Sequence, residues 1–215
     1  AITAGKLGIG FTDAQIKIGN TALDSLTTGT LNTAVGDAAL TATTTGQQNT
    51  AVGAYALDAN TTGDFNTGVG LNALTGNTTG DSNTALGVSA LKTASTADNN
   101  TAVGYFSLRA NTTGTQNVAV GANALLSNTT AYDNVAIGFE AGKSITDGLR
   151  NTFIGAECGE DNTASNNTAV GQRALRATTT GANNVAIGRE ALLSNTTGAS
   201  NVAVGANALD ANTTA

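Results

Sequence analysis

The chain has 215 residues, among them 27 Gly, no Pro, no His, no Met and no Trp, and only 4% aromatic side chains. This composition lacks the bulky residues of an ordinary globular core, yet 40% hydrophobic residues, many of them Ala, is too apolar for a disordered chain. The net charge is −6 and the nine basic residues are scattered, so the chain lacks the clustered Lys and Arg of a nucleic-acid-binding surface.

Residues 1–14 carry only an echo of the pattern that follows, and we expect an irregular entry or cap there. Residues 15–215 form a tandem repeat in which each unit opens with Asn, except that the first opens with Gln15. The later units begin at Asn32, Asn49, Asn66, Asn83, Asn100, Asn117, Asn134, Asn151, Asn167, Asn184 and Asn201, every 17 residues except for one interval of 16 after Asn151. Such a period predicts one small structural unit stacked on copies of itself.

Positions within the repeat, counted from its Asn as position 1, predict short strands. Position 5 is Gly in every unit, as in Gly53, which indicates a positive φ or a close backbone approach. Position 2 is Thr or a β-branched aliphatic residue, position 3 is mostly Ala, and position 4 is always β-branched or Leu, which favours a strand. The pair Ala-Leu at positions 8 and 9 predicts a second strand. We therefore predict an all-β fold, a parallel β-solenoid of about twelve coils.

A helical repeat is the alternative, since Ala and Leu are good helix formers. Gly at position 5 and again near position 15 interrupts nearly every possible helix within about ten residues, which is too short to be stable alone. The recurring Asn-Thr-Thr-Gly is typical of turns. Helical repeats also need about 33 or more residues per unit.

The repeat also predicts where the side chains point. We expect Val at position 4 and Leu at position 9 to fill the rod. Ala at position 3, as in Ala51 and Ala102, would then point outward and form a flat face on which identical rods pack closely. Asn at position 1 and Thr at position 13 would form hydrogen-bonded ladders, because identical side chains in a parallel stack lie about 4.8 Å apart.

No catalytic, cofactor-binding or metal-binding residues are predicted, so the chain is not expected to be an enzyme. It has no His to act as a base, no Gly-Lys-Thr/Ser phosphate loop, and only irregularly placed Asp. The single cysteine, Cys158, replaces Ala at position 8 and is expected to be a small buried residue. The chain has no run of about 18 apolar residues, so no membrane span is predicted.

The variable positions carry the remaining information. Opposite charges recur in consecutive units, at position 10 in Lys143, Glu160 and Arg176 and at position 7 in Glu157, Arg173 and Glu190, and should stack in pairs.

The least regular zone is 139–166, where Gly142 and Gly159 replace Leu, and Phe153 replaces Ala. Local repacking of the core explains these changes. A bend or a recognition patch of Phe139, Glu140, Phe153 and Glu157 is the alternative.

The sequence Asn134-Val135-Ala136-Ile137-Gly138, and its longer copy from Asn184 to Leu192, resembles the head repeat of YadA-like trimeric autotransporter adhesins. It is equally similar to the Asn-Thr-Ala-Val-Gly repeats of phage tail-fibre proteins. The resemblance implies left-handed β-rolls, a trimer and adhesion to host or matrix surfaces, on a cell or a virion. The adhesin repeat is typically shorter, so the added Asn-Thr-Thr-Gly segment should project as a longer turn.

The function expected from the sequence is that of a structural extracellular fibre module that presents an adhesive surface. An end-to-end filament is the first alternative, and an ice-binding surface made by Thr at positions 13 and 14 is the second. If the cell glycosylates Asn-x-Thr sites, the projecting edge would be coated with sugar at eight of them: Asn60, Asn77, Asn99, Asn111, Asn128, Asn166, Asn195 and Asn212.

Overall fold

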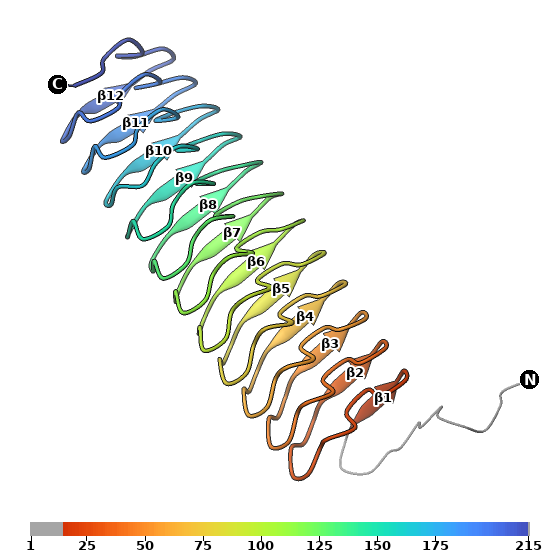
Figure 1. Cartoon of the computed structure of the whole chain (residues 1–215). Helices are drawn as coiled ribbons and strands as arrows, with labels where there is room; N and C mark the ends of the chain where they lie inside the picture. Colours follow the sequence, from red (N-terminus) through yellow and green to blue (C-terminus); the bar gives the residue numbers. More distant parts are fainter. Residues whose placement is uncertain (1–14, 215) are drawn as a thin grey trace, which may run out of the picture.

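The computed structural model describes residues 15–214, so the expected cap at 1–14 lies outside the described residues. The chain winds into an elongated rod in which twelve strands of three residues form one parallel sheet in the order β1 to β12 (Figure 1). This confirms the predicted parallel β-solenoid. The strands are β1 Ile16–Ile18, β2 Thr33–Val35, β3 Thr50–Val52, β4 Thr67–Val69, β5 Thr84–Leu86, β6 Thr101–Val103, β7 Val118–Val120, β8 Val135–Ile137, β9 Thr152–Ile154, β10 Thr168–Val170, β11 Val185–Ile187 and β12 Val202–Val204.

The strands pair in exact register, so each position of the repeat stacks on the same position of the next coil. Thr50 pairs with Thr67 and Val52 with Val69. The register is kept between β9 and β10, where Thr152 pairs with Thr168 although this coil is one residue shorter. The missing residue is therefore removed from a turn and not from the sheet.

The expected second strand at positions 8 and 9 is wrong. Each described coil has one strand, and the Ala-Leu pair lies in a tight turn. In the third coil Ala56 and Leu57 are both fully buried, whereas consecutive residues of a strand point to opposite faces. Leu57 also has a φ of 53°, in the left-handed region. The turn still bonds to the next coil, since Leu57 N–H donates to the Ala73 carbonyl at 3.0 Å.

The predicted directions of positions 3 and 4 are also reversed. Ala51 at position 3 is completely buried, whereas Val52 at position 4 is 36% exposed. The coil is too narrow for two large side chains, because Leu at position 9 already reaches across it. A methyl group added at Gly68, which occupies position 3 of β4, would lie 3.3 Å from Leu57 Cγ. Ala therefore fills the remaining space, and the β-branched side chains point outward.

Gly at position 5 is required for both of the predicted reasons. Gly121 has a φ of 132°, and a Cβ there would lie 2.4 Å from the carbonyl oxygen of Gly138 in the next coil. Any side chain would therefore collide with backbone and adopt a strained conformation. This residue lets successive coils approach to strand-pairing distance just after each strand ends.

The Asn ladder is confirmed, with a backbone partner in each step. The Asn49 side chain is completely buried. Its Nδ2 donates to the Gly63 carbonyl of the same coil at 2.8 Å, and its Oδ1 accepts from the Asn66 N–H of the next coil at 2.9 Å. Each Asn therefore closes its own coil and links it to the next. Its side chain pairs with backbone N–H and carbonyl groups that have no partner in the sheet.

The Thr ladder at position 13 is likewise formed with backbone groups. Thr61 Oγ1 donates to the Thr78 carbonyl at 2.9 Å, and Thr78 Oγ1 donates to the Ser95 carbonyl at 2.9 Å. Most hydroxyl groups of this column are thus used in bonds between coils, whereas that of Thr146 donates to Asp147 Oδ1 in its own coil. The neighbouring position 14, as in Thr62 and Thr130, is exposed.

Candidate functional site

The outward surface of the sheet is the most extended apolar feature of the rod. We call it the outer sheet face. It consists of the side chains at repeat positions 2 and 4, which are the first and third residues of each strand from β1 to β12. Each strand contributes two outward side chains, in most coils a Thr or Val followed by a Val, Ile or Leu. At position 4, Leu86 is 48% exposed, Ile137 38% and Ile187 43%. Large apolar side chains thus form a row along the whole sheet.

The dimensions of the outer sheet face follow from strand geometry. Eleven intervals of about 4.8 Å make it about 50 Å long, and outward residues of one strand are about 7 Å apart. These lengths give the face an area of about 350 Å² before side-chain width is added, in which position 4 is apolar throughout and position 2 is Thr in seven of the twelve strands. Because the strands are in register, the patch repeats with the period of the coil.

Sequence reasoning missed this face because it placed the larger side chains inside. A signal for the correct direction was present. Position 3 is small in ten of the twelve strands, the exceptions being Lys17 in β1 and Phe153 in β9, whereas position 4 alternates freely among Val, Ile and Leu. The nearly uniform small size at position 3 indicates that this side of the strand faces the narrow interior.

The predicted charge stacking is present in the coils that carry β8 to β11. Arg173 Nε lies 2.9 Å from Glu157 Oε2, and Arg176 Nε lies 2.7 Å from Glu160 Oε2. Lys143 bridges Glu140 at 3.1 Å and Glu160 at 3.7 Å. These groups are partly exposed and screened by solvent, so each pair adds little to stability, and Glu157 meets Arg173, and Glu160 meets Arg176, at matching positions of adjacent coils.

The stacked charges form a charge ladder, in which the pKa values of several members are shifted. The hydrogen bond from Arg173 holds the pKa of Glu157 below its ordinary value. The pKa of Lys143 is raised mainly by its hydrogen bond to Glu140, and that of Arg176 mainly by its hydrogen bond to Glu160. All three shifts favour the charged forms. We assign the ladder to alignment of the coils, since its charges compensate one another.

The irregular zone repacks the core, as the first interpretation predicted. Phe153 is completely buried inside the coil, so it cannot belong to the suggested recognition patch. Its ring occupies the space that Leu fills elsewhere. A Cβ on Gly159 would lie 2.7 Å from three ring atoms, and a Cβ on Gly142 would lie 3.1 Å from Phe153 Cδ2. Of the other members, Phe139 is 50% exposed, whereas Glu140 and Glu157 belong to the charge ladder.

Cys158 lies where the sequence predicted, buried in the core at an Ala position. Its Sγ donates to the Ala169 carbonyl at 3.3 Å. Burial raises the pKa of the thiol to about 12. The thiolate, which is the reactive form, is therefore scarce at neutral pH.

Five of the eight Asn-x-Thr sites are closed to glycosylation in the folded rod. These five Asn stand at position 12 and are completely buried: Asn60, Asn77, Asn111, Asn128 and Asn195. Asn60 Nδ2, for example, donates to the Gly63 carbonyl at 3.1 Å. An amide held inside the rod cannot be modified without opening the coil. Of the other sites, Asn99 and Asn166 are exposed and Asn212 is partly exposed.

Within residues 15–214, no group of three or more His, Cys, Asp or Glu is placed to hold a metal ion. The described region also has no helix of the length and apolar character needed to cross a membrane. Comparison with known proteins adds no assignment: no protein-family model matches the chain, and no curated protein sequence is significantly similar to it.

Proposed function

We propose that the protein is a non-enzymatic fibre module that assembles side by side through the outer sheet face and presents an extended surface for adhesion. The observation that carries the proposal is the row of β-branched and Leu side chains at position 4 along the sheet, of which seven are at least 36% exposed and the other five are partly exposed. Covering an apolar row of this kind with another surface removes it from water and is therefore favourable.

A second copy of the rod is the partner that fits this strip best. The side chains repeat once per coil, so a complementary surface must have protruding side chains, and spaces between them, at the same interval. An identical rod has that spacing along its whole length. The Val-Ala-Ile-Gly resemblance points to three chains, and three rods around one axis would each cover the face of the others. The extracellular location is proposed on the same resemblance.

Static light scattering tests the assembly. The chain mass is 21.1 kDa, and the intact protein is expected at three times this value. The variant Leu86→Lys/Ile137→Lys places two charges on the outer sheet face and should run as a monomer, because buried unpaired charge is costly. Both side chains point to solvent in the single rod, so its fold should survive.

The matched control is Thr79→Lys/Thr130→Lys, which adds the same charge at two exposed residues of position 14. It should keep the mass of the unmodified protein. A monomeric unmodified protein, or equal masses for both double variants, would contradict the proposed interface.

End-to-end filament formation is the second candidate. Among the described residues, β1 pairs only with β2 and β12 only with β11, so each leaves one strand edge without a strand partner. Such edges can add further strands. Masses that grow with protein concentration without limit would favour this candidate over the trimer. A thermal-hysteresis measurement on the same sample tests the ice-binding alternative.

A further inference from the structure

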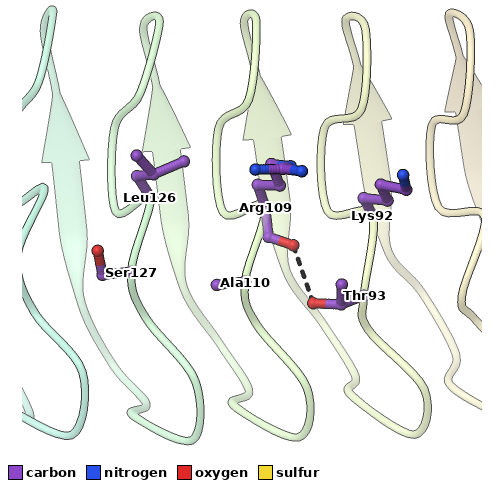
Figure 2. A pocket seen from close by; sticks show the side chains of 6 residues that line it. All are labelled: Lys92, Thr93, Arg109, Ala110, Leu126 and Ser127. Carbon is purple, nitrogen blue, oxygen red and sulfur yellow. Dashed lines mark hydrogen bonds between the residues drawn. The ribbon is translucent and has the colours of Figure 1, made fainter.

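We infer that a groove around Lys92 and Arg109 binds the acid group of an acidic saccharide. The inference gives the proposed adhesive fibre a ligand class and rests on the proposed function only for its biological use, since the groove belongs to a single chain. It is lined by Lys92, Thr93, Arg109, Ala110, Leu126 and Ser127, from three consecutive coils (Figure 2). Its volume is about 430 Å³.

The two cations in the groove are exceptional because no carboxylate among residues 15–214 pairs with them. The described residues include eight Lys and Arg, and six of them have a carboxylate within 4.0 Å. Lys92 and Arg109 are the two for which the described part of the chain supplies none. They also stand next to each other, at position 10 of consecutive coils.

Stacking like charges is unfavourable in a register-locked rod. Side chains at one position of adjacent coils are about 4.8 Å apart, and like charges placed directly opposite one another destabilise a sheet-like stack. In later coils the same position alternates in sign, with Lys143, Glu160 and Arg176. An anion bound between Lys92 and Arg109 would turn their repulsion into two attractive contacts.

Arg109 is held in place by its own coil and by the preceding one. Its guanidinium carbon lies 4.5 Å from the centre of the Phe106 ring, and that ring stacks on Tyr105 at 3.8 Å. Cation–π contact restricts the long side chain. Thr93 Oγ1 donates to the Arg109 carbonyl at 2.9 Å, which fixes the backbone beneath it (Figure 2). The arrangement is therefore partly ordered before a ligand arrives.

The rest of the lining favours a saccharide over a simple ion or a nucleic acid. Leu126 and Ala110 offer apolar surface for the C–H face of a sugar ring, and Ser127 offers a hydroxyl group. The volume is larger than one sulfate or phosphate ion needs. A nucleic acid would require many more phosphate contacts than two cations provide.

The groove stays open when rods pack through the outer sheet face. Its residues follow Leu at position 9, whose side chain crosses the core toward the sheet, as Leu57 does toward Gly68. Positions 10 and 11 therefore lie on the wall across from the strands. One groove per chain would give a trimer three equivalent sites, and simultaneous contacts would raise the apparent affinity for a polymer.

Titration calorimetry on the intact protein tests the site with three probes: a sulfated oligosaccharide, a uronic-acid oligosaccharide and the neutral oligosaccharide of the same backbone. The acidic probes should bind and the neutral probe should bind at least tenfold more weakly. Inorganic sulfate forms a fourth arm and should also bind at least tenfold more weakly than the sulfated oligosaccharide. Equal binding of sulfate and oligosaccharide, or of neutral and acidic probes, would overturn the saccharide assignment.

The variant Lys92→Gln/Arg109→Gln should lower the affinity for the acidic probes at least tenfold. The control Arg189→Gln removes a cation that pairs with Glu190, outside the groove, and should change the affinity less than twofold. Equal losses in both variants, or no binding by the unmodified protein, would refute the site. Repeating the titration on the Leu86→Lys/Ile137→Lys variant separates the two proposals, because single-site binding should persist even if assembly is lost or never occurs.

Discussion

The Phe153 coil allows a quantitative test of how the rod fills its interior. Phe153 is completely buried and takes the space of two Leu side chains, those absent at Gly142 and Gly159. Phe153→Ala should therefore leave a cavity spanning two coils and destabilise the protein by about 3–5 kcal/mol. Gly159→Leu alone should also destabilise, by about 1–3 kcal/mol or more, because its Cβ would lie 2.7 Å from the ring.

Combining these two changes should restore most of the loss. Leu at 159 would adopt the arrangement of a regular coil, and the backbone already permits it, since Gly159 has a φ of 59° and Leu175 one of 53°. The coupling energy should thus exceed about 2 kcal/mol with a sign opposite to the single losses. Adding Gly142→Leu should bring the coil to the regular composition of its neighbours.

Urea unfolding followed by circular dichroism measures these free energies. Since a solenoid can open coil by coil, amide exchange at the Gly142 N–H, which donates to the Cys158 carbonyl at 2.9 Å, supplies a local reading. Leu125→Gly in a coil without the Phe ring is the control and should destabilise strongly. A neutral Phe153→Ala, or single losses that simply add in the double variant, would refute the proposed exchange of one Phe for two Leu.

Three further predictions follow from the polar and turn positions. Gly121→Ala should destabilise the rod by about 3 kcal/mol or more, because strain adds to a backbone collision. Gly68→Ala should cost much less, because the added Cβ would lie no closer than 3.2 Å to its neighbours and Ala fills the same position in most other strands; equal urea midpoints would contradict this. Asn117→Ala leaves a buried N–H and a buried carbonyl without partners and should cost about 2–5 kcal/mol, which the same assay measures. The lowered pKa of Glu157 means that its stabilisation is complete above its ordinary pKa and is lost as pH falls through the folded value; urea midpoints of the unmodified protein should therefore fall more between pH 6 and pH 3 than those of Arg173→Gln, and parallel curves would contradict the link.

The coil itself could be predicted from the sequence because its determinants are local and repeated. Gly at position 5, Asn at position 1 and the charge pairs such as Arg173 with Glu157 all recur at fixed spacing, and each has one physical role in a parallel stack. Repetition made those roles visible within a single chain. The exchange of Phe153 for two Leu was readable for the same reason, since each departure is measured against intact copies.

The directions of the side chains could not be derived in the same way. Alternation along a strand shows that Ala51 and Val52 face opposite sides, but not which side is the interior. The choice depends on the width of the coil, and therefore on the turn that brings Leu57 across it. That turn uses left-handed residues other than Gly, with a φ of 57° at Tyr55 and 53° at Leu57. Local propensity does not favour such conformations, so neighbouring coils must impose them.

The binding groove proposed at Lys92 and Arg109 depends on the lack of carboxylate partners for these two cations among the described residues. The sequence places them 17 residues apart, like the other members of their column. Only the contacts show that the remaining described cations are paired with carboxylates. Whether a cation has a carboxylate partner depends on which side chains the fold brings close, and the sequence alone does not show this.

Small-angle X-ray scattering of the intact protein tests the central claim most directly, because it separates the thickness of a rod from its length. Assembly through the outer sheet face predicts a cross-section clearly larger than that of one coil, with a rod length of about 50–60 Å for twelve coils at about 4.8 Å each. The Leu86→Lys/Ile137→Lys variant should return to the single-coil cross-section at unchanged length. A single-coil cross-section in the unmodified protein, whether the rods stay short or lengthen into filaments, would contradict the account.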